Sequence, residues 1–293
     1  MAALTGSTIA STYTGLLKTS DSGARGAEGS ADQCSDGAGN TIPLFVSATE
    51  VYAIGSGTGT SHTAFGKDCG VDLAAGTGNS LFGEGAGADV TTGEHNVAVG
   101  YHALYQGTTE TDDNVAIGYN AMSGSWTTAA VNDCVVIGSG AGAGALVAAA
   151  SGLTAVGTAA GAAVTSGTKN TIVGYAAGDA LTSSSYNTVL GHGALSTEVT
   201  GGTATAIGTE ALGLQNQGDG DNTENTGVGY RAGYNNVTGK SNTYLGFLAG
   251  QGATGGSNSG NTGLGKDALL AITDGTNNVA VGIDAGTAIT TGD

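Results

Sequence analysis

From residue 63 onward the chain repeats one short motif: a β-prone run ending in glycine, then two residues, then alanine. Thirteen glycines end these runs, and we call them the marker glycines. They are Gly66, Gly83, Gly100, Gly118, Gly138, Gly157, Gly174, Gly191, Gly208, Gly229, Gly246, Gly265 and Gly282. Successive marker glycines are 17, 17, 18, 20, 19, 17, 17, 17, 21, 17, 19 and 17 residues apart, so the basal period is 17. This period predicts a repeat architecture in which each unit stacks on the next.

Each position of the motif favours a short strand between tight turns. The residue before the marker glycine is large and apolar in every copy, and two places earlier stands threonine, serine or valine. Asparagine stands four places before the glycine in nine of thirteen copies, as in Asn96-Val-Ala-Val-Gly100. Asparagine tolerates a left-handed corner and bonds neighbouring backbone, and glycine permits the next bend. We therefore predict an all-β fold, a parallel β-solenoid or β-roll rod of about 13 coils over residues 51–293.

Both sides of each predicted strand are apolar. The residue before the marker glycine and the residue two places earlier point to one side, and the residue between them points to the other. Two apolar sides indicate that both are buried, one inside the coil and one against a partner. Another copy of the chain is the expected partner, and three-fold packing around the rod axis is the expected arrangement. We expect the small middle residues, including Ala98, Ala116, Ala155 and Ala206, to lie in the contact of this homotrimer.

Composition and charge exclude several classes of protein. Seven basic residues against 24 acidic ones give a formal charge of −17, so we expect no nucleic-acid partner. Glycine fills 56 positions, but a single proline and the absence of a three-residue period exclude collagen. Cys34, Cys69 and Cys134 are odd in number and far apart, so they form no disulfide framework.

Targeting and membrane segments are also missing from the printed sequence. No apolar run is long enough to span a bilayer, so we expect no membrane insertion. Residues 1–18 lack the basic start and apolar stretch of a secretory signal, which favours assembly in a cytoplasm.

The motif N-x-x-[VIL]-G-x-x-A resembles the head repeats of trimeric autotransporter adhesins. Its longer copies, such as Asn225-Thr-Gly-Val-Gly-Tyr-Arg-Ala-Gly233, look more like repeats found in bacteriophage tail fibres. The resemblance covers roughly residues 63–293, and the variable period departs from the adhesin heads. Two earlier segments, Ile9 to Asp21 and Ser35 to Ser47, are similar to fibre segments of marine tailed phages.

The resemblance implies a structural fibre or spike protein of a tailed bacteriophage, located in the virion and presenting a host-attachment surface. The non-repetitive residues 1–50 would then attach the fibre to other virion proteins. A host surface glycan or protein is the implied external partner. The alternative is the passenger domain of a trimeric adhesin on a bacterial cell surface.

The sequence offers no constellation for catalysis, so we expect no enzyme activity and no cofactor. His62, His95, His102 and His192 lie in different coils without metal-ligand spacing. A polysaccharide-cleaving spike would need paired carboxylates in a groove, which such uniform repeats do not provide.

One acidic cluster is a weak candidate for calcium. It lies in the longest insertion and comprises Asp219, Asp221 and Glu224. Calcium prefers several oxygen ligands, but the spacing does not match an EF-hand loop, and a solvated loop is the favoured interpretation.

Aromatic residues give the candidates for receptor contact. Tyr101, Tyr119, Tyr175 and Tyr230 directly follow marker glycines, at a position that is charged in other copies and therefore at least partly exposed. Such rings can stack on sugars, and mutual stacking along the rod is the structural alternative. Trp126, in an insertion, is a further candidate.

Three consecutive coils, from Gly100 to Gly157, are longer than the basal period. Extra residues cannot enter a stacked ladder without breaking its register, so we expect them to bulge at the corners. The bulges would include the charged run Glu110, Asp112 and Asp113 together with Trp126. On one side of the rod they would form a continuous patch, the best candidate for contact with a receptor or a neighbouring fibre protein. The alternative is that these loops vary in length because nothing constrains them.

Overall fold

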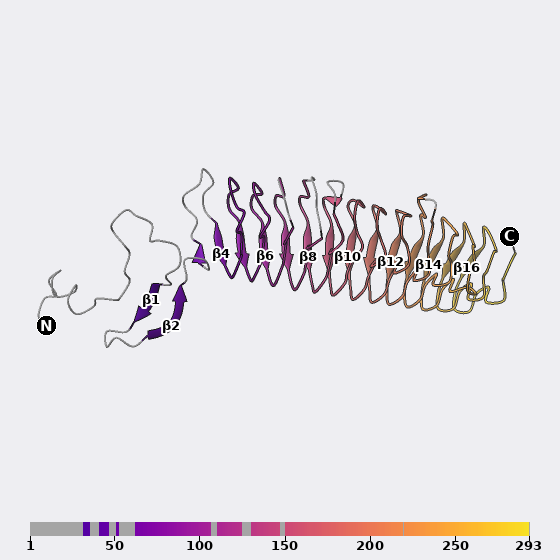
Figure 1. Ribbon diagram of the computed structural model, residues 1–293. Helices are drawn as coiled ribbons and strands as arrows, with labels where there is room; N and C mark the ends of the chain where they lie inside the picture. The colour runs from indigo at the N-terminus through magenta and orange to yellow at the C-terminus, as the bar shows by residue number, and fades with distance from the viewer. Residues whose placement is uncertain are drawn as a thin grey trace, which may run out of the picture.

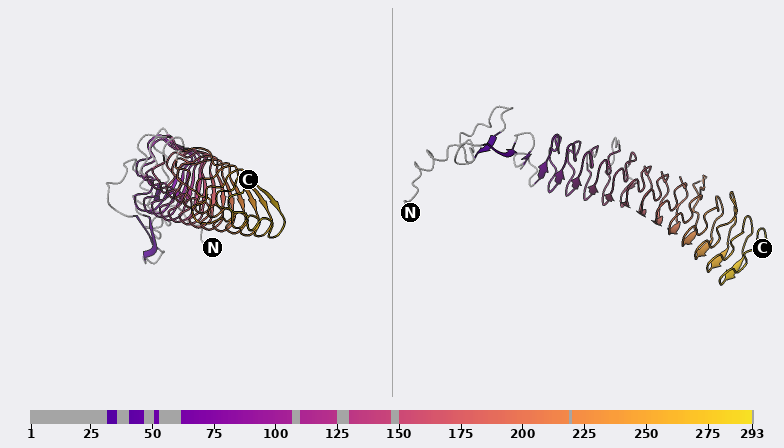
Figure 2. Two further views of the ribbon diagram at one scale, coloured as in Figure 1. Left: turned by 90° about the vertical axis from the view of Figure 1, so that its right-hand side faces the viewer. Right: turned by 90° about the horizontal axis from the view of Figure 1, so that it is seen from below.

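The computed structural model describes residues 32–35, 41–46, 51–52, 62–106, 110–124, 130–146, 150–218 and 220–292, the first three ranges as backbone only. This part of the chain is all-β and contains no helical element. Thirteen short parallel strands stack in sequence order into a solenoid (Figure 1). Figure 2 shows that the coils follow one gently curved axis. The predicted parallel β-solenoid is confirmed.

The strands are short and evenly distributed. β1 (Asp32–Ser35) and β2 (Thr41–Val46) form an antiparallel pair, and β3 (Val51–Tyr52) lies antiparallel to β4. The parallel strands are β4 (Thr63–Phe65), β5 (Ser80–Phe82), β6 (Val97–Val99), β7 (Val115–Ile117), β8 (Val135–Ile137), β9 (Thr154–Val156), β10 (Thr171–Val173), β11 (Thr188–Leu190), β12 (Thr205–Ile207), β13 (Thr226–Val228), β14 (Thr243–Leu245), β15 (Thr262–Leu264) and β16 (Val279–Val281).

Strand register is constant even where the period is not. Val97 pairs with Val115, and Val115 with Val135, across spacings of 18 and 20 residues. The extra residues are therefore accommodated between strands, as the sequence predicts. Segments 107–109, 125–129 and 147–149, which include Trp126, lie outside the described residues.

The marker glycines lie next to one another from coil to coil and form a continuous row. At Gly118 φ is +132°, and a Cβ there would lie 2.7 Å from the carbonyl oxygen of Gly138 in the next coil. Eleven of the other marker glycines make the same close approach to the next marker glycine, and only Gly282, in the last coil, does not. The motif requires glycine because successive backbones nearly touch at this corner.

The middle residue of each strand fills the coil interior. Ala98, Ala116, Ala155 and Ala206 are fully buried within their own chain. The prediction that these alanines lie in a contact between chains is therefore wrong. A single coil is so narrow that its interior needs the middle residues as core, and the two flanking residues of each strand point outward instead.

The core adjusts its volume between neighbouring coils. Tyr244, the largest fully buried side chain, occupies the middle of β14. Its in-register neighbours are Gly227 in β13 and Gly263 in β15. A Cβ on Gly263 would lie 3.1 Å from the Tyr244 ring. Gly263 thus provides space for the tyrosine, whereas a Cβ on Gly227 would meet Leu212 instead.

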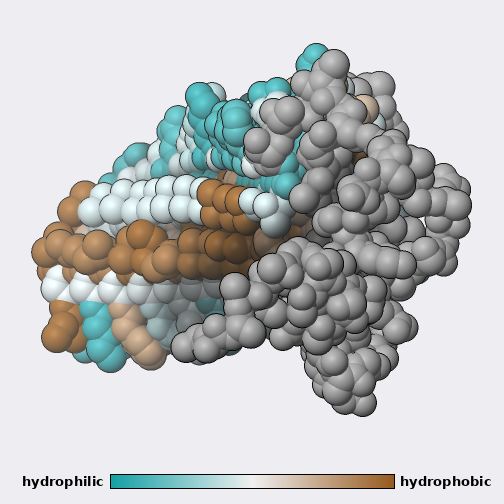
Figure 3. All heavy atoms as spheres, turned by 90° about the vertical axis from the view of Figure 1, so that its left-hand side faces the viewer, coloured by the Kyte–Doolittle hydropathy of each residue, from teal (hydrophilic) through white to brown (hydrophobic). Residues whose placement is uncertain are grey.

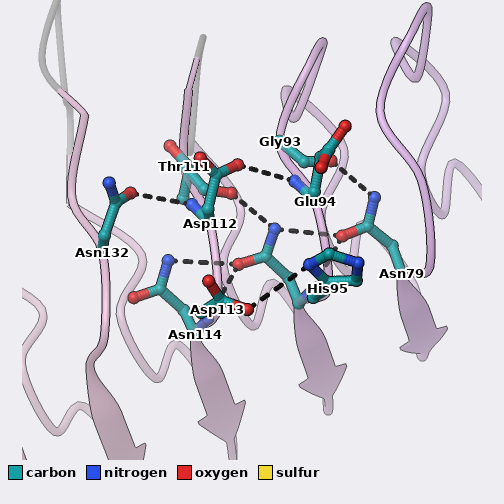
Figure 4. Close-up of polar contacts among 10 residues, drawn as sticks. Asn79, Gly93, Glu94, His95, Thr111, Asp112, Asp113, Asn114 and Asn132 are labelled. Atoms are coloured by element: carbon teal, nitrogen blue, oxygen red, sulfur yellow. Dashed lines mark hydrogen bonds and ion pairs between the residues drawn. The ribbon is translucent and has the colours of Figure 1, made fainter.

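A ladder of buried asparagines crosses the coils just before the strands (Figure 4). The Nδ2 of Asn96 donates to Oδ1 of Asn79 at 3.0 Å and to the carbonyl oxygen of Thr111 at 2.6 Å. Asn114 continues the ladder by the same contacts. Each amide therefore satisfies backbone groups that the corner would otherwise bury unpaired.

Candidate functional site

The outward side of the parallel sheet forms a hydrophobic band along the rod (Figure 3). We call the residues directly before the marker glycines the outer row, and those two places earlier the threonine row. None of the twenty-six residues of these two rows is charged. The outer row consists of Phe65, Phe82, Val99, Ile117, Ile137, Val156, Val173, Leu190, Ile207, Val228, Leu245, Leu264 and Val281.

In the single chain, seven of the thirteen outer-row residues are exposed and the other six are half-buried. Exposed fractions are 53% at Phe65, 48% at Leu190 and 45% at Leu245. A continuous apolar surface of this length is unusual for a soluble monomer and is typical of an interaction surface. Charged residues make up 11% of the chain, and none of them falls in this band.

The residues directly after the marker glycines form a separate row, which we call the turn row. The four tyrosines predicted there lie on the surface, with Tyr119 at 57% and Tyr175 at 59% exposed. Tyr101 stacks on Tyr119 with ring centroids 5.4 Å apart, and Tyr175 stacks on His192 at 5.3 Å. The expected exposure and the stacking along the rod are both observed, whereas contact of these rings with a receptor stays a prediction.

The second and fifth positions after a marker glycine lie beside the turn row. His102 stacks between Tyr101 and Tyr105, with centroid distances of 3.9 and 4.1 Å. In a later coil, the Arg231 guanidinium lies over the rings of Tyr230 and Tyr234. These three positions therefore form one surface, and bulky side chains at them contact each other across it.

At the corner near Asp112, polar side chains accept hydrogen bonds from backbone N–H groups of neighbouring coils (Figure 4). The carboxylate of Asp112 accepts a hydrogen bond from the backbone N–H of Glu94 at 2.8 Å, and Asn132 accepts one from the N–H of Asp112. Asp113 pairs with His95 at 3.4 Å. Asp112 and Asn132 thus belong to a second side-chain ladder beside the asparagine ladder.

The two calcium candidates in the described residues contact other side chains. Asp221 pairs with Lys240 at 2.8 Å, and Glu224 accepts a hydrogen bond from the Ser241 hydroxyl at 3.0 Å. Asp219 lies outside the described residues. Over the ranges that the structure describes, no group of three or more His, Cys, Asp or Glu side chains is arranged to hold a metal.

One buried carboxylate was not predicted from the sequence. Glu198 is fully buried, and its Oε1 accepts hydrogen bonds from the backbone N–H groups of Val199, Thr200 and Gly201. Its Oε2 accepts one from Gln215.

This cluster occupies the place where Ala204 interrupts the asparagine ladder. Gln215 accepts a hydrogen bond from Asn225 Nδ2 at 2.9 Å and so connects Glu198 to the ladder beyond the interruption. The signal available in the sequence was the alanine at an asparagine position, followed directly by the longest coil.

The two cysteines in described coils are structural. Cys69 and Cys134 are free and fully buried. Burial raises the pKa of the Cys69 thiol and raises that of Cys134 to about 11, so both remain neutral and poorly nucleophilic. The Cys134 thiol donates weakly to the carbonyl oxygen of Ala150 at 3.6 Å, where an asparagine would place its Nδ2.

The histidines lie apart, as their spacing indicates. His62 accepts a hydrogen bond from Asn79 at the start of the asparagine ladder, and His192 stacks in the turn row.

Within the described ranges, no helix is both long and apolar enough to span a bilayer. No protein-family model matches the chain, and no curated protein is significantly similar to it.

Proposed function

We propose that this chain is a structural fibre or spike subunit of a tailed bacteriophage, self-associated as a homotrimer and presenting a host-attachment surface. The observation that carries the proposal is the uncharged outer band, which runs along all thirteen parallel strands. The function needs no reactive group and no cofactor. A bacterial trimeric surface adhesin is the alternative, because its resemblance rests on the same motif.

A second copy of the chain is the partner that fits the band best. The rows of the band repeat at the strand spacing of about 4.8 Å. An identical rod alongside presents rows with the same repeat, so large residues of one copy can alternate with those of the other along the whole contact. A globular partner could match only a few coils.

Three copies close such a contact more fully than two. Each strand directs two neighbouring rows outward, the threonine row and the outer row. Around a three-fold axis, the outer row of one copy can pack against the threonine row of the next, and the contact then closes without leaving apolar edges. The marker glycines border the outer row and add no side chain that would hold neighbouring chains apart.

Self-association is tested by changing the band without changing the core. Val173→Asp combined with Ile207→Asp places charge on the outer row, and should convert the wild-type trimer to a rod-shaped monomer with unchanged β-sheet circular dichroism. Tyr186→Asp, at an exposed site outside the band, is the matched control and should leave the trimer intact. Light scattering over a concentration series reads out the mass; a wild-type monomer would refute the proposal.

Salt gives an independent test of the same surface. The chains repel each other through their charge of −17 and attract each other through an uncharged band. Raising ionic strength screens the repulsion, so the trimer should become tighter between low and high salt. A contact built on ion pairs would weaken instead.

Location separates the two candidate functions. Gold-labelled antibody against the chain should decorate purified phage particles if it is a virion fibre. Decoration of bacterial cells without phage would favour the adhesin.

A further inference from the structure

We propose that the surface between Tyr119 and Tyr175 binds neutral pyranose sugars, with one sugar ring stacked on the free face of each tyrosine. This inference rests on the proposed attachment function and gives that function a location and a ligand class. It begins from a break in the turn row. Between these two tyrosines the row carries Ser139 and Thr158 instead of rings.

The stacking pattern leaves one face of each tyrosine free. The partner of Tyr119 is Tyr101, in the preceding coil, and the two rings are within 9° of parallel. The partner of Tyr175 is His192, in the following coil, also at 9°. The uncovered faces of Tyr119 and Tyr175 are therefore directed toward each other across the two intervening coils.

Exposure agrees with this geometry. Tyr119 and Tyr175 are 57% and 59% exposed, whereas Tyr101 and Tyr230 are 41% and 39% exposed. Tyr101 is covered by Tyr119 and His102, and Tyr230 by Phe247 and Arg231. Among the four turn-row tyrosines, the two that border the break keep the most accessible ring surface.

The two coils of the break carry only small side chains on this surface. At the first, second and fifth positions after the marker glycine they have Ser139, Gly140 and Ala143, then Thr158, Ala159 and Ala162. A Cβ added to Gly140 would meet no atom within 4 Å, whereas one added to Gly85 would contact His102 and Tyr105. Among the residues that the structure describes, the space above Gly140 is therefore open.

The dimensions suit rings on both sides. Tyr119 and Tyr175 are three coils apart, which is about 14 Å at a strand spacing of about 4.8 Å. Stacked ring centroids lie about 4.5–7 Å apart, so a ring on each tyrosine face fits in this interval. The scaffold is a stack of hydrogen-bonded coils, so the faces are held in place before a ligand arrives.

The charge and polarity of this surface favour a neutral sugar over other ring-shaped ligands. The six small residues of the break are uncharged, and the chain as a whole is strongly acidic, which disfavours sulfated or carboxylated ligands. A pyranose offers a C–H face for the electron-rich face of tyrosine. Its hydroxyl groups can bond the exposed hydroxyls of Ser139 and Thr158 and the two phenols.

The test fills the break with the side chain that its neighbours already carry. Ser139→Tyr combined with Thr158→Tyr completes a stacked row from Tyr101 to His192 and covers both free faces. Existing pairs stack at 5.2–5.4 Å from coil to coil, so the added rings fit the repeat and the variant should fold. Thr209→Tyr makes the same change at a different interruption of the row and is the matched control.

Binding is measured on the full chain by saturation-transfer difference NMR and titration calorimetry. The probes are neutral tetrasaccharides of glucose, galactose and N-acetylglucosamine, with a sulfated tetrasaccharide for comparison. We expect at least one neutral probe to bind, and Ser139→Tyr/Thr158→Tyr to abolish its binding. Tyr119→Ala and Tyr175→Ala should each weaken binding roughly three- to tenfold, and Thr209→Tyr should not change it.

Three binding results would overturn the inference: no neutral probe binds, the filled variant binds as well as wild type, or only the sulfated probe binds. A fourth result comes from attachment of the chain to host envelopes. Attachment that is lost after protease treatment of the envelopes, and kept after periodate oxidation of their sugars, would also overturn it. Light scattering on the same samples measures the oligomeric state, so a failure of the sugar site can be distinguished from a failure of the proposed trimer. A trimer that binds no sugar refutes only the sugar site, and a monomer that binds sugar refutes only the assembly.

Discussion

Asn114 donates two hydrogen bonds to a single oxygen atom: its backbone N–H and its Nδ2 both reach Oδ1 of Asn96, at 3.1 Å each. Its Nδ2 also donates to the carbonyl oxygen of Val131, in the next corner, at 2.7 Å. One amide therefore connects three successive coils. Repetition of this arrangement gives a four-residue segment, too short to be stable alone, a fixed place in the stack.

Removing one amide from the middle of the ladder should be costly. Asn96→Ala leaves the Thr111 carbonyl and the Asn114 N–H buried without their partners, so we expect a loss of about 2–4 kcal/mol in the free energy of unfolding. Asn278→Ala removes Nδ2 bonds to Asn261 and to the Gly292 carbonyl in the partly exposed last coil, and should cost about 1 kcal/mol. Urea unfolding measures both, and equal losses would contradict the importance of burial.

Two marker glycines separate backbone strain from packing. Both Gly118 and Gly282 have positive φ, at +132° and +123°, but only Gly118 would clash with the next coil on gaining a Cβ. Gly282→Ala should cost about 1–3 kcal/mol from the unfavourable conformation alone. Gly118→Ala should cost clearly more, because the backbone of Gly138 cannot move without breaking register. Thermal unfolding of the two variants provides the comparison, and similar melting temperatures would refute it.

The buried carboxylate should be sensitive to loss of its charge. Glu198→Gln replaces an acceptor that several N–H groups contact with an amide that carries two donors, so we expect a loss of about 1–3 kcal/mol. Glu210→Gln, which breaks an ion pair with Arg231 at the surface, is the matched control and should cost less than about 1 kcal/mol. The two losses are compared by the urea concentrations at the unfolding midpoints. A larger loss of stability for Glu210→Gln than for Glu198→Gln would be evidence against the buried network.

Alkaline pH should weaken the fold through Cys134. Its pKa is raised from 9.0 to about 11 by burial, so the unfolded thiol ionises at lower pH than the folded one. Stability from this group is fully present below pH about 9 and is lost as pH rises to about 11, by up to roughly 3 kcal/mol. Cys134→Ala removes this titration.

The measurement is urea unfolding of wild type and Cys134→Ala between pH about 8 and 11 under reducing conditions. The free energy of unfolding of the wild type should decrease, relative to that of the Cys134→Ala variant, as pH increases. A difference that is constant with pH would show that the thiol ionises equally in both states.

The repeat predicted the coil, the strands and the glycine row because each depends on local spacing. It did not predict which apolar side of the strand faces inward, since Ala116 and Ile117 are both suited to burial. That choice depends on the width of the coil, a property of the whole turn. The positive φ at Leu104, Met122 and Leu195 was not predictable either, because leucine and methionine have no preference for that conformation. They adopt it here because it places their side chains in the coil interior.

The candidate surfaces were predictable to different degrees. Exposure of the four tyrosines followed from the charged residues at their position in other coils. The free faces of Tyr119 and Tyr175 did not, because they depend on which neighbour each ring stacks upon. Glu198 was obscured because a lone acidic residue in a variable segment is typical of a solvated loop.

Constant register with variable corners has a consequence for how such a molecule can change over generations. Each strand contacts only the strand before and the strand after it, so a gene duplication or deletion of one whole repeat joins two compatible edges and leaves every other contact unchanged. The rod can thus be lengthened or shortened in steps of one coil, and each added coil extends the same outer band. The length of the rod and the chemistry of its corners can then evolve separately, because the number of coils determines the first and the residues between strands determine the second.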